Sequence, residues 1–301
     1  TGGTAILNVL ANDLLNCNAV VRSEVDLTLA SALPSVLTFD IATGKVTVKP
    51  NTPKGTYSFD YKICEIANSG NCSTTTVEVK VDAPAILAVK ENLGPINGSV
   101  GGNTTSLIAS DKLNGVQAVI GSNPGEVTLT GTAPAGLTIN ADGTITVAKG
   151  VKEGNYDVTY EICDNNNIGN CSTATSTVVV TAGVLVANLD NAGSVTGGSS
   201  SQTLINIFDN DTYNGSKLNP SDVKLTAGTD PKGYLTIGAD GNAVLKPNTP
   251  AGTYEVTYEI CEVLNTGNCS TNKVQVTVTA PAIVAVAENL GSVNGRIGGT
   301  T

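Results

Sequence analysis

Six of the seven cysteines form three equally spaced pairs, and sulfur atoms placed in this way could form disulfides, bind a metal or carry out redox chemistry. In each pair seven residues separate the cysteines, and the second cysteine lies in an Asn-Cys-Ser-Thr run. A structural zinc site takes four Cys or His ligands, whereas this chain has no histidine and only two thiols per pair. The spacing therefore predicts three disulfides, Cys64 with Cys72, Cys163 with Cys171, and Cys261 with Cys269.

The residue alternation around the third pair places both of its cysteines on one face. In "YEVTYEIC" (254–261) Cys261 is in phase with the polar residues, and in "CSTNKVQVTV" (269–278) Cys269 is out of phase with the valines. Alternate side chains of a strand point to opposite faces, and facing residues of an antiparallel pair are close enough to bridge. Each closed loop should contribute ~2.5 kcal/mol to stability. Disulfides also indicate an oxidising compartment outside the cytosol.

Cys17 has no partner in this scheme. It lies in "NDLLNC" (12–17), where the related stretches "SDKLNG" and "NDTYNG" have Gly115 and Gly215. A free thiol and a bond to a cysteine outside this sequence both remain open.

The cysteine pairs belong to a longer repeat. The glycines that open "GTYSFDYKIC", "GNYDVTYEIC" and "GTYEVTYEIC" are Gly55, Gly154 and Gly252, so one unit has about 100 residues, a common domain size. We expect one repeat in residues 1–82, which lacks its first strand, and two complete repeats in 83–181 and 182–280. Residues 281–301 are expected to begin a further repeat.

Each unit is expected to contain about seven short strands and no helix. Alternating stretches such as "LTINADGTITV" (137–147) are typical of strands joined by turns, here at Asp142-Gly143. Seven strands in about 100 residues indicate an immunoglobulin-like sandwich. The predicted fold is all-β, with tandem immunoglobulin-like β-sandwich domains arranged as a rod.

Six of the eight tyrosines occupy two positions of the repeat. Tyr57, Tyr156 and Tyr254 each stand two residues after the opening glycine, which resembles a tyrosine corner, in which the hydroxyl binds nearby backbone. The other position holds Tyr61, Tyr160 and Tyr258, and we expect these side chains in the core.

The connections between repeats are short, as in "KVDAPAILAV" (80–89) and "VTAPAIVAV" (278–286). About three residues separate successive strands, and Pro84 or Pro281 occupies two of the joints, so little bending is expected. The first strand of a unit could pair within its own repeat, which is the simpler arrangement, or complete a neighbouring one by strand donation.

Several kinds of chemistry are not expected. Without histidine the chain cannot form a Ser-His-Asp or Cys-His site, no acid pair recurs at matched positions in all three units, and no phosphate-binding or dinucleotide motif is present. We therefore predict no enzyme activity and no cofactor. The net charge of −10 argues against nucleic acid or an anionic membrane as a partner, and the longest uncharged stretch is too polar to insert into a membrane.

A recurring aspartate is a weak calcium candidate. Asp13, Asp111 and Asp211 occupy the same place near the start of each unit, and the third unit adds Asp209. Calcium requires six to eight oxygen ligands, which these residues do not supply. The alternative is that each aspartate caps a turn through its side chain.

The run "PNTPAGTYEVTYEICEVLNTGNCSTNKVQVTVTA" (247–280), with "NDTYNG" (210–215) ahead of it, resembles the tandem repeats of very large surface adhesins of Bacteroidota, in particular SprB-like gliding-motility adhesins of flavobacteria. The resemblance covers all three units, although the second has "AKGVKEGNY" in place of "KPNTPAGTY". It implies type IX secretion, display at the cell surface as a long filament, and adhesion during gliding.

The predicted function is a structural stalk that extends a binding end and bears force. Its partners would be neighbouring repeats of the same chain, and surface polysaccharide or a substratum bound through regions outside this segment. The alternatives are spacer repeats of a secreted hydrolase or carbohydrate-binding protein, and a self-assembling pilus or matrix subunit.

Overall fold

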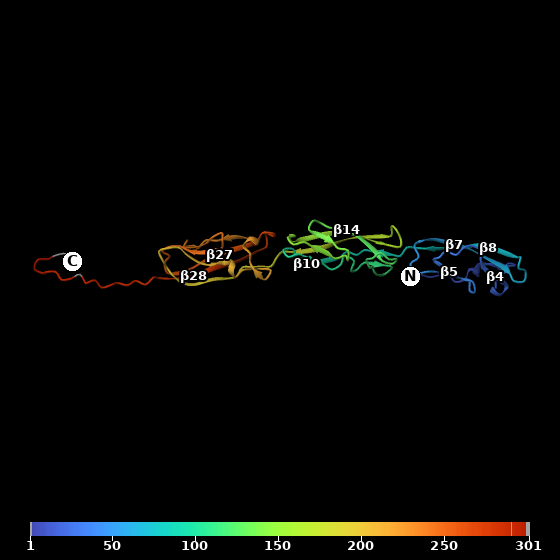
Figure 1. The fold of residues 1–301 in the computed structure, drawn as a ribbon, viewed down its shortest axis with the longest axis horizontal. Coiled ribbons are helices and arrows are strands. Elements are labelled where there is room, and N and C mark those ends of the chain that lie inside the picture. Colours follow the sequence, from blue (N-terminus) through green and yellow to red (C-terminus); the bar gives the residue numbers. More distant parts are fainter. Residues whose placement is uncertain (1, 290, 299–301) are drawn as a thin grey trace. The chain divides into compact units, whose positions relative to one another are not determined.

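The computed structural model describes residues 2–289 and 291–298, and strands dominate it (Figure 1). Three separate hydrophobic cores are present, one in each expected repeat, and they share no residue. By contacts the chain divides into two compact units between residues 181 and 182, so the first two repeats belong to one unit and the third to the other. Each repeat is a two-layer β-sandwich, as the sequence predicts.

The second repeat has a four-stranded sheet in the order β10-β18-β17-β14, packed against a three-stranded sheet β11-β16-β15. A small sheet, β13-β12-β9, adjoins them. The strands are β9 (Ile86–Leu87), β10 (Asn92–Asn97), β11 (Gly102–Asn103), β12 (Lys112–Leu113), β13 (Val116–Gln117), β14 (Val127–Thr132), β15 (Leu137–Ile139), β16 (Ile145–Val147), β17 (Gly154–Asp164) and β18 (Cys171–Thr181).

The third repeat has the same topology, with sheets β20-β28-β27-β24, β21-β26-β25 and β19-β22-β23. Its elements are β19 (Leu185–Val186), β20 (Asp190–Thr196), β21 (Gln202–Asn206), the 3-10 turn η3 (Ile207–Asp209), β22 (Thr212–Tyr213), β23 (Ser216–Lys217), η4 (Pro220–Asp222), β24 (Val223–Ala227), β25 (Leu235–Ile237), β26 (Asn242–Leu245), β27 (Gly252–Glu262) and β28 (Cys269–Thr279).

The first repeat has sheets β4-β7-β8, β1-β6-β5 and β2-β3, so its larger sheet has three strands where the other repeats have four. Its elements are β1 (Gly3–Ile6), η1 (Val9–Asn12), β2 (Leu14–Leu15), β3 (Asn18–Ala19), η2 (Arg22–Glu24), β4 (Val25–Leu29), β5 (Leu37–Asp40), β6 (Lys45–Val48), β7 (Gly55–Glu65) and β8 (Cys72–Val81).

The first long strand of a repeat pairs within that repeat. Strand β10 runs parallel to β18, with Leu93 opposite Val178, and β20 runs parallel to β28, with Asp190 opposite Val274. This is the simpler of the two arrangements that the sequence left open, and no donated strand is present among the described residues. Residues 280–289 and 291–298 contain no strand, and their assignment to a further repeat remains a prediction.

The longest hairpin of each repeat follows the expected alternation. In β27 the buried residues are Tyr254, Val256, Tyr258, Ile260 and Glu262, all at most 3% exposed, and the residues between them face outward. Strands β27 and β28 pair without interruption from Gly252 opposite Val278 to Cys261 opposite Cys269. One buried and one solvated face is the pattern expected of an antiparallel sandwich sheet.

The turn at Asp142-Gly143 is longer than a two-residue hairpin turn. Residues 140–144 connect β15 to β16, and only Gly143 (φ 82°) is in the left-handed region. The backbone N–H of Gly143 donates to the carbonyl of Asn140 at 2.9 Å, and the N–H of Asn140 donates to Thr144 at 2.8 Å. A hairpin of this kind needs one left-handed residue after an ordinary turn, which explains why a single glycine is sufficient.

Candidate functional site

The disulfide hairpin is the feature that recurs most closely in the three repeats. The Sγ–Sγ distances are 2.01, 2.09 and 2.06 Å for Cys64–Cys72, Cys163–Cys171 and Cys261–Cys269. In each pair the two cysteines are directly opposite one another on antiparallel strands. The second cysteine of every pair is exposed and the first is half-buried, so the bridges lie on the outward face, as the alternation predicts.

The hydrogen bonds of the ladder explain why these positions can bridge. The N–H of Glu65 donates to the carbonyl of Asn71 at 2.9 Å, so Cys64 and Cys72 form the neighbouring pair, which has no hydrogen bond of its own. Facing residues of that kind are the closer ones in an antiparallel ladder, and the two Cα atoms are 4.0 Å apart. Two clusters of possible metal ligands, Glu161 with Cys163 and Cys171 and their counterparts in the third repeat, consist mainly of these bonded sulfurs. A disulfide offers no thiolate to a metal.

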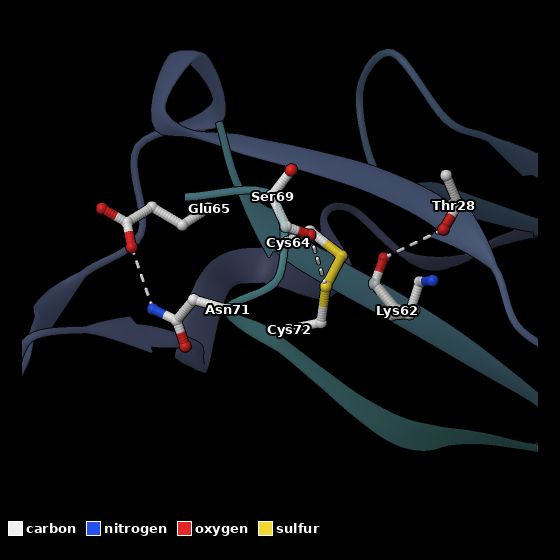
Figure 2. The surroundings of a disulfide bond; sticks show 7 residues. All are labelled: Thr28, Lys62, Cys64, Glu65, Ser69, Asn71 and Cys72. Carbon is white, nitrogen blue, oxygen red and sulfur yellow. Dashed lines mark hydrogen bonds between the residues drawn. A yellow bond between two sulfur atoms is a disulfide. The ribbon is translucent and has the colours of Figure 1, made fainter. Parts of the chain in front are cut away.

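A carboxylate organises the loop that each disulfide closes, and the sequence analysis did not identify it. The loops read "EIANSGN", "DNNNIGN" and "EVLNTGN", so each begins with an acid and has asparagines three and six residues later. Glu65 accepts from the Asn71 side chain at 2.9 Å (Figure 2), and Asp164 accepts from the Asn167 side chain at 2.6 Å. The signal was present in the spacing of acid and amide residues, which are typical of loops that bind their own backbone.

The acid of the third repeat is the most buried of the three. Glu262 is 1% exposed and accepts hydrogen bonds from the Tyr213 hydroxyl at 2.5 Å, from the Asn268 side chain at 2.8 Å and from the backbone of Gly183 at 3.3 Å. Burial raises the pKa of Glu262, but these donors favour the charged form and the net result is a pKa below the usual range. Donation by Asn71 and then Asn68 likewise lowers the pKa of Glu65.

The three predicted corner tyrosines make the same hydrogen bond. Tyr57 donates to the carbonyl of Pro53, Tyr156 to that of Lys152 and Tyr254 to that of Pro250, each at 2.9 Å and four residues upstream. The hydroxyl therefore ties the loop that crosses between the sheets to the start of the long strand. This is the geometry of a tyrosine corner.

The recurring aspartates bind core tyrosines. Asp13 accepts from Tyr61 at 2.7 Å and Asp111 accepts from Tyr160 at 2.9 Å. Asp111 also accepts from the backbone N–H of Val89, at 2.7 Å, just ahead of β10. Asp111 therefore joins the incoming segment to the core, which is not the contact of a local turn cap, and calcium binding at these aspartates stays a prediction. Asp209 is exposed and pairs with Lys217 at 3.0 Å.

A second acid joins this network in the third repeat. The Tyr258 hydroxyl lies 2.9 Å from the Asn188 carbonyl, 2.8 Å from Asp190 Oδ2 and 3.1 Å from Asp211 Oδ1. Three acceptors surround a hydroxyl that carries one proton, so a further proton on one of the acids is favourable. Burial, foremost, together with the charge of Asp211 raises the pKa of Asp190 to about 6, and burial raises the pKa of Asp211.

The second repeat has a related pair. Glu91 occupies the position of Asp190 in the aligned stretches "AVKEN" and "ANLDN". Burial, followed by the Glu91 charge, raises the pKa of Asp111, whose Oδ2 is buried and has no hydrogen-bond partner. The sequence analysis, which required an acid pair in all three units, did not identify these pairs in two of them.

No protein-family model and no curated protein matches the chain. Among solved structures it is similar to the human desmocollin-1 ectodomain, with 10% identity, a TM-score of 0.35, and coverage of 86% of this chain and 54% of that one. It is also similar to mouse cadherin-23 EC22-24, with 15% identity, a TM-score of 0.32 and coverage of 85% and 86%. The chain thus spans about half the length of the desmocollin-1 ectodomain.

Proposed function

We propose that this chain is a structural segment of a long cell-surface adhesin filament, which extends a binding end and bears force. The observation that carries the proposal is the parallel pairing of the first long strand with the last strand in the second and third repeats. The β10 strand pairs with β18 from Asn92 opposite Thr177 to Asn97 opposite Thr181.

Parallel pairing determines how tension loads a repeat. When the two ends of a repeat are pulled apart, β10 and β18 are drawn in opposite directions along their own axes. The hydrogen bonds between them, such as that from the Thr177 N–H to the Glu91 carbonyl at 3.0 Å and that from the Gly98 N–H to the Thr181 carbonyl at 2.9 Å, are then loaded together. An antiparallel terminal pair would instead open one bond at a time. Forced unfolding depends on the unfolding rate, which shared loading slows.

The disulfides support an extracellular location, because such bonds persist in oxidising compartments. Among residues 2–289 and 291–298 no helix qualifies as a membrane span. The resemblance to adhesins of Bacteroidota extends the proposal to type IX secretion, surface display and gliding. In this proposal the repeats have no enzyme activity, their neighbours in the array are their partners, and polysaccharide or a substratum is bound elsewhere in the filament.

Single-molecule stretching of the chain from its two ends, in non-reducing buffer, tests this function. We expect two force peaks from the second and third repeats, and a weaker event from the first repeat, whose described strands include no parallel partner for β8. The first repeat is thus an internal control. Extension of all three repeats without force peaks would contradict a load-bearing role.

A further inference from the structure

The first and second repeats lie in one compact unit, and hydrogen bonds link a loop of one to a loop of the other. Residues 49–54, between β6 and β7, face the disulfide loop of the second repeat. The Asn166 side chain donates to the carbonyl of Asn51 at 2.8 Å, and the backbone N–H of Lys54 donates to Asn167 Oδ1 at 2.5 Å. The disulfide loop therefore supplies both a donor and an acceptor to the preceding repeat.

The disulfide loop holds Asn167 in one orientation. Asn167 is 4% exposed, and its side-chain NH2 donates to Asp164 Oδ2 at 2.6 Å, which leaves the amide oxygen pointing at Lys54. Asp164 is itself 3% exposed and also accepts from the backbone N–H of Asn166 at 2.9 Å. Cys163, next to Asp164, forms the disulfide with Cys171 and closes this loop.

The same loop also binds the linker that enters its repeat. In the second repeat the Asn170 side chain donates to the carbonyl of Pro84 at 2.9 Å. In the third repeat the equivalent Asn268 donates to the carbonyl of Gly183 at 2.7 Å, and Gly183 donates its N–H to Glu262. Pro84 has no N–H to offer, which explains why Asp164 uses only loop donors. Two repeats therefore show this contact independently.

Polar groups of both repeats gather at the first joint. Asn51, Thr52, Asp164, Asn166 and Asn167 border a hollow of about 540 Å³ that is open to solvent, together with apolar residues such as Val48, Val81 and Leu113. The hydrogen bonds across the joint therefore depend on the order of the disulfide loop that supplies them.

We propose that the disulfide loop of a repeat is the binding site for the linker that leads into the same repeat. In the second repeat this loop also binds residues 49–54 of the preceding repeat. The Cys163–Cys171 bond then stiffens the joint between two repeats as well as its own hairpin. The biological role of a stiff joint rests on the proposed stalk function, whereas the contacts at the joint do not depend on it.

Distance distributions between two spin labels on the full chain test the inference. Ketone amino acids at the exposed positions Glu78 and Thr173 carry the nitroxides, and Cys17→Ser is present throughout, so no free cysteine interferes. We expect a narrow distribution in this parent. Replacement of Cys163 and Cys171 by alanine should at least double its width and accelerate hydrogen exchange at the Lys54 amide.

Two further variants keep the test decisive. Replacement of Cys64 and Cys72 by alanine removes a disulfide whose loop, residues 65–71, makes no hydrogen bond to the described residues of the second repeat. The width should therefore stay that of the parent. Asn166→Ala keeps the disulfide and introduces the residue that the first repeat has at Ala67, and should broaden the distribution to a smaller degree. If the second repeat fails to fold without its disulfide, the width of the distance distribution in Asn166→Ala tests the inference alone.

Parent-like widths in both second-repeat variants would overturn the inference, as would equal broadening on loss of Cys64–Cys72. These measurements apply no force, so they can fail while the stretching experiment succeeds, or the reverse.

Discussion

At the scale of single residues, the crowded Tyr258 hydroxyl makes the third repeat sensitive to pH. The groups that face Asp190 are Asp211, Asp209 and Tyr258, and none of them is a cation. The pKa of Asp190 is raised to about 6 from an unfolded value near 3.9, so the folded state holds a proton that the unfolded state releases. The resulting stability is complete below about pH 4 and is lost as the pH rises through about 6.

We predict that the third repeat is less stable at pH 7.5 than at pH 5 by about 1–3 kcal/mol, and that Asp190→Asn removes most of this difference. The amide introduced by Asp190→Asn would stay neutral at both pH values, whereas the Asp190 carboxyl is mostly neutral at pH 5 and charged at pH 7.5. Native-state hydrogen exchange at Val256 and Val274 reports the third core. The first repeat is the internal control, because there the Tyr61 hydroxyl contacts the carbonyl of Val9 and a single acid, Asp13. An unchanged pH difference in Asp190→Asn would reject this explanation.

Cys17 affects the stability of the first repeat through its backbone conformation more than through its thiol. Asn16 (φ 51°) and Cys17 (φ 63°) form the two-residue turn between β2 and β3, and Gly115 (φ 80°) and Gly215 (φ 72°) occupy the second position in the other repeats. A residue with a side chain costs about 1–2 kcal/mol in the left-handed region. Replacement by glycine removes this cost, but the greater freedom of glycine in the unfolded chain offsets part of the gain.

We therefore expect Cys17→Gly to stabilise the first repeat by about 0.5–1 kcal/mol in urea unfolding. Cys17→Ser keeps the same backbone conformation and should leave stability unchanged, which separates the turn from the thiol. A glycine variant no more stable than the serine variant would show that the turn is not strained. The exposed thiol remains without a partner among the described residues.

At the scale of elements, the sequence predicted the strands and the orientation of their side chains, which local periodicity encodes. It did not predict contacts between side chains of strands that are far apart in the chain. Alternation located the long hairpins, and parity put the cysteines on the outward face, because both depend on neighbouring residues of one strand. The pairing of β20 with β28, and the meeting of Asp190 with Asp211, join residues far apart in the chain. Asn114-Gly115 and Asn214-Gly215 form the turns of two short hairpins, and this Asn-Gly signal, which is local, is one that the sequence analysis missed.

The disulfide loop gives an element-scale prediction. Glu262→Ala would leave the Tyr213 hydroxyl, the Asn268 side chain and the Gly183 N–H without their acceptor in a buried place, so we expect a loss of about 2–4 kcal/mol from the third repeat. Glu65→Ala removes the less buried counterpart and should cost less than Glu262→Ala, because water can replace the lost acceptor. Urea unfolding of both variants makes the comparison, and equal losses would show that the acid has no special role in the third repeat.

At the scale of the whole chain, repeats joined end to end carry the same tension, so each disulfide limits how far its repeat can extend once it unfolds. Cys163 and Cys171 are 8 residues apart in sequence, and their Cα atoms are 4.1 Å apart when bonded. An extended chain spans at most about 3.3–3.6 Å per residue, so the intact bond withholds about 25 Å from the unfolding step of the second repeat. We predict that stretching in dithiothreitol, or with both cysteines replaced by alanine, lengthens that step by about 25 Å. The same increase is expected for each other repeat in dithiothreitol, whereas the alanine variant should change one step only. Steps of equal length with and without dithiothreitol would mean that the bonds are absent from the folded chain in solution, and the argument for an oxidising location would fail with them.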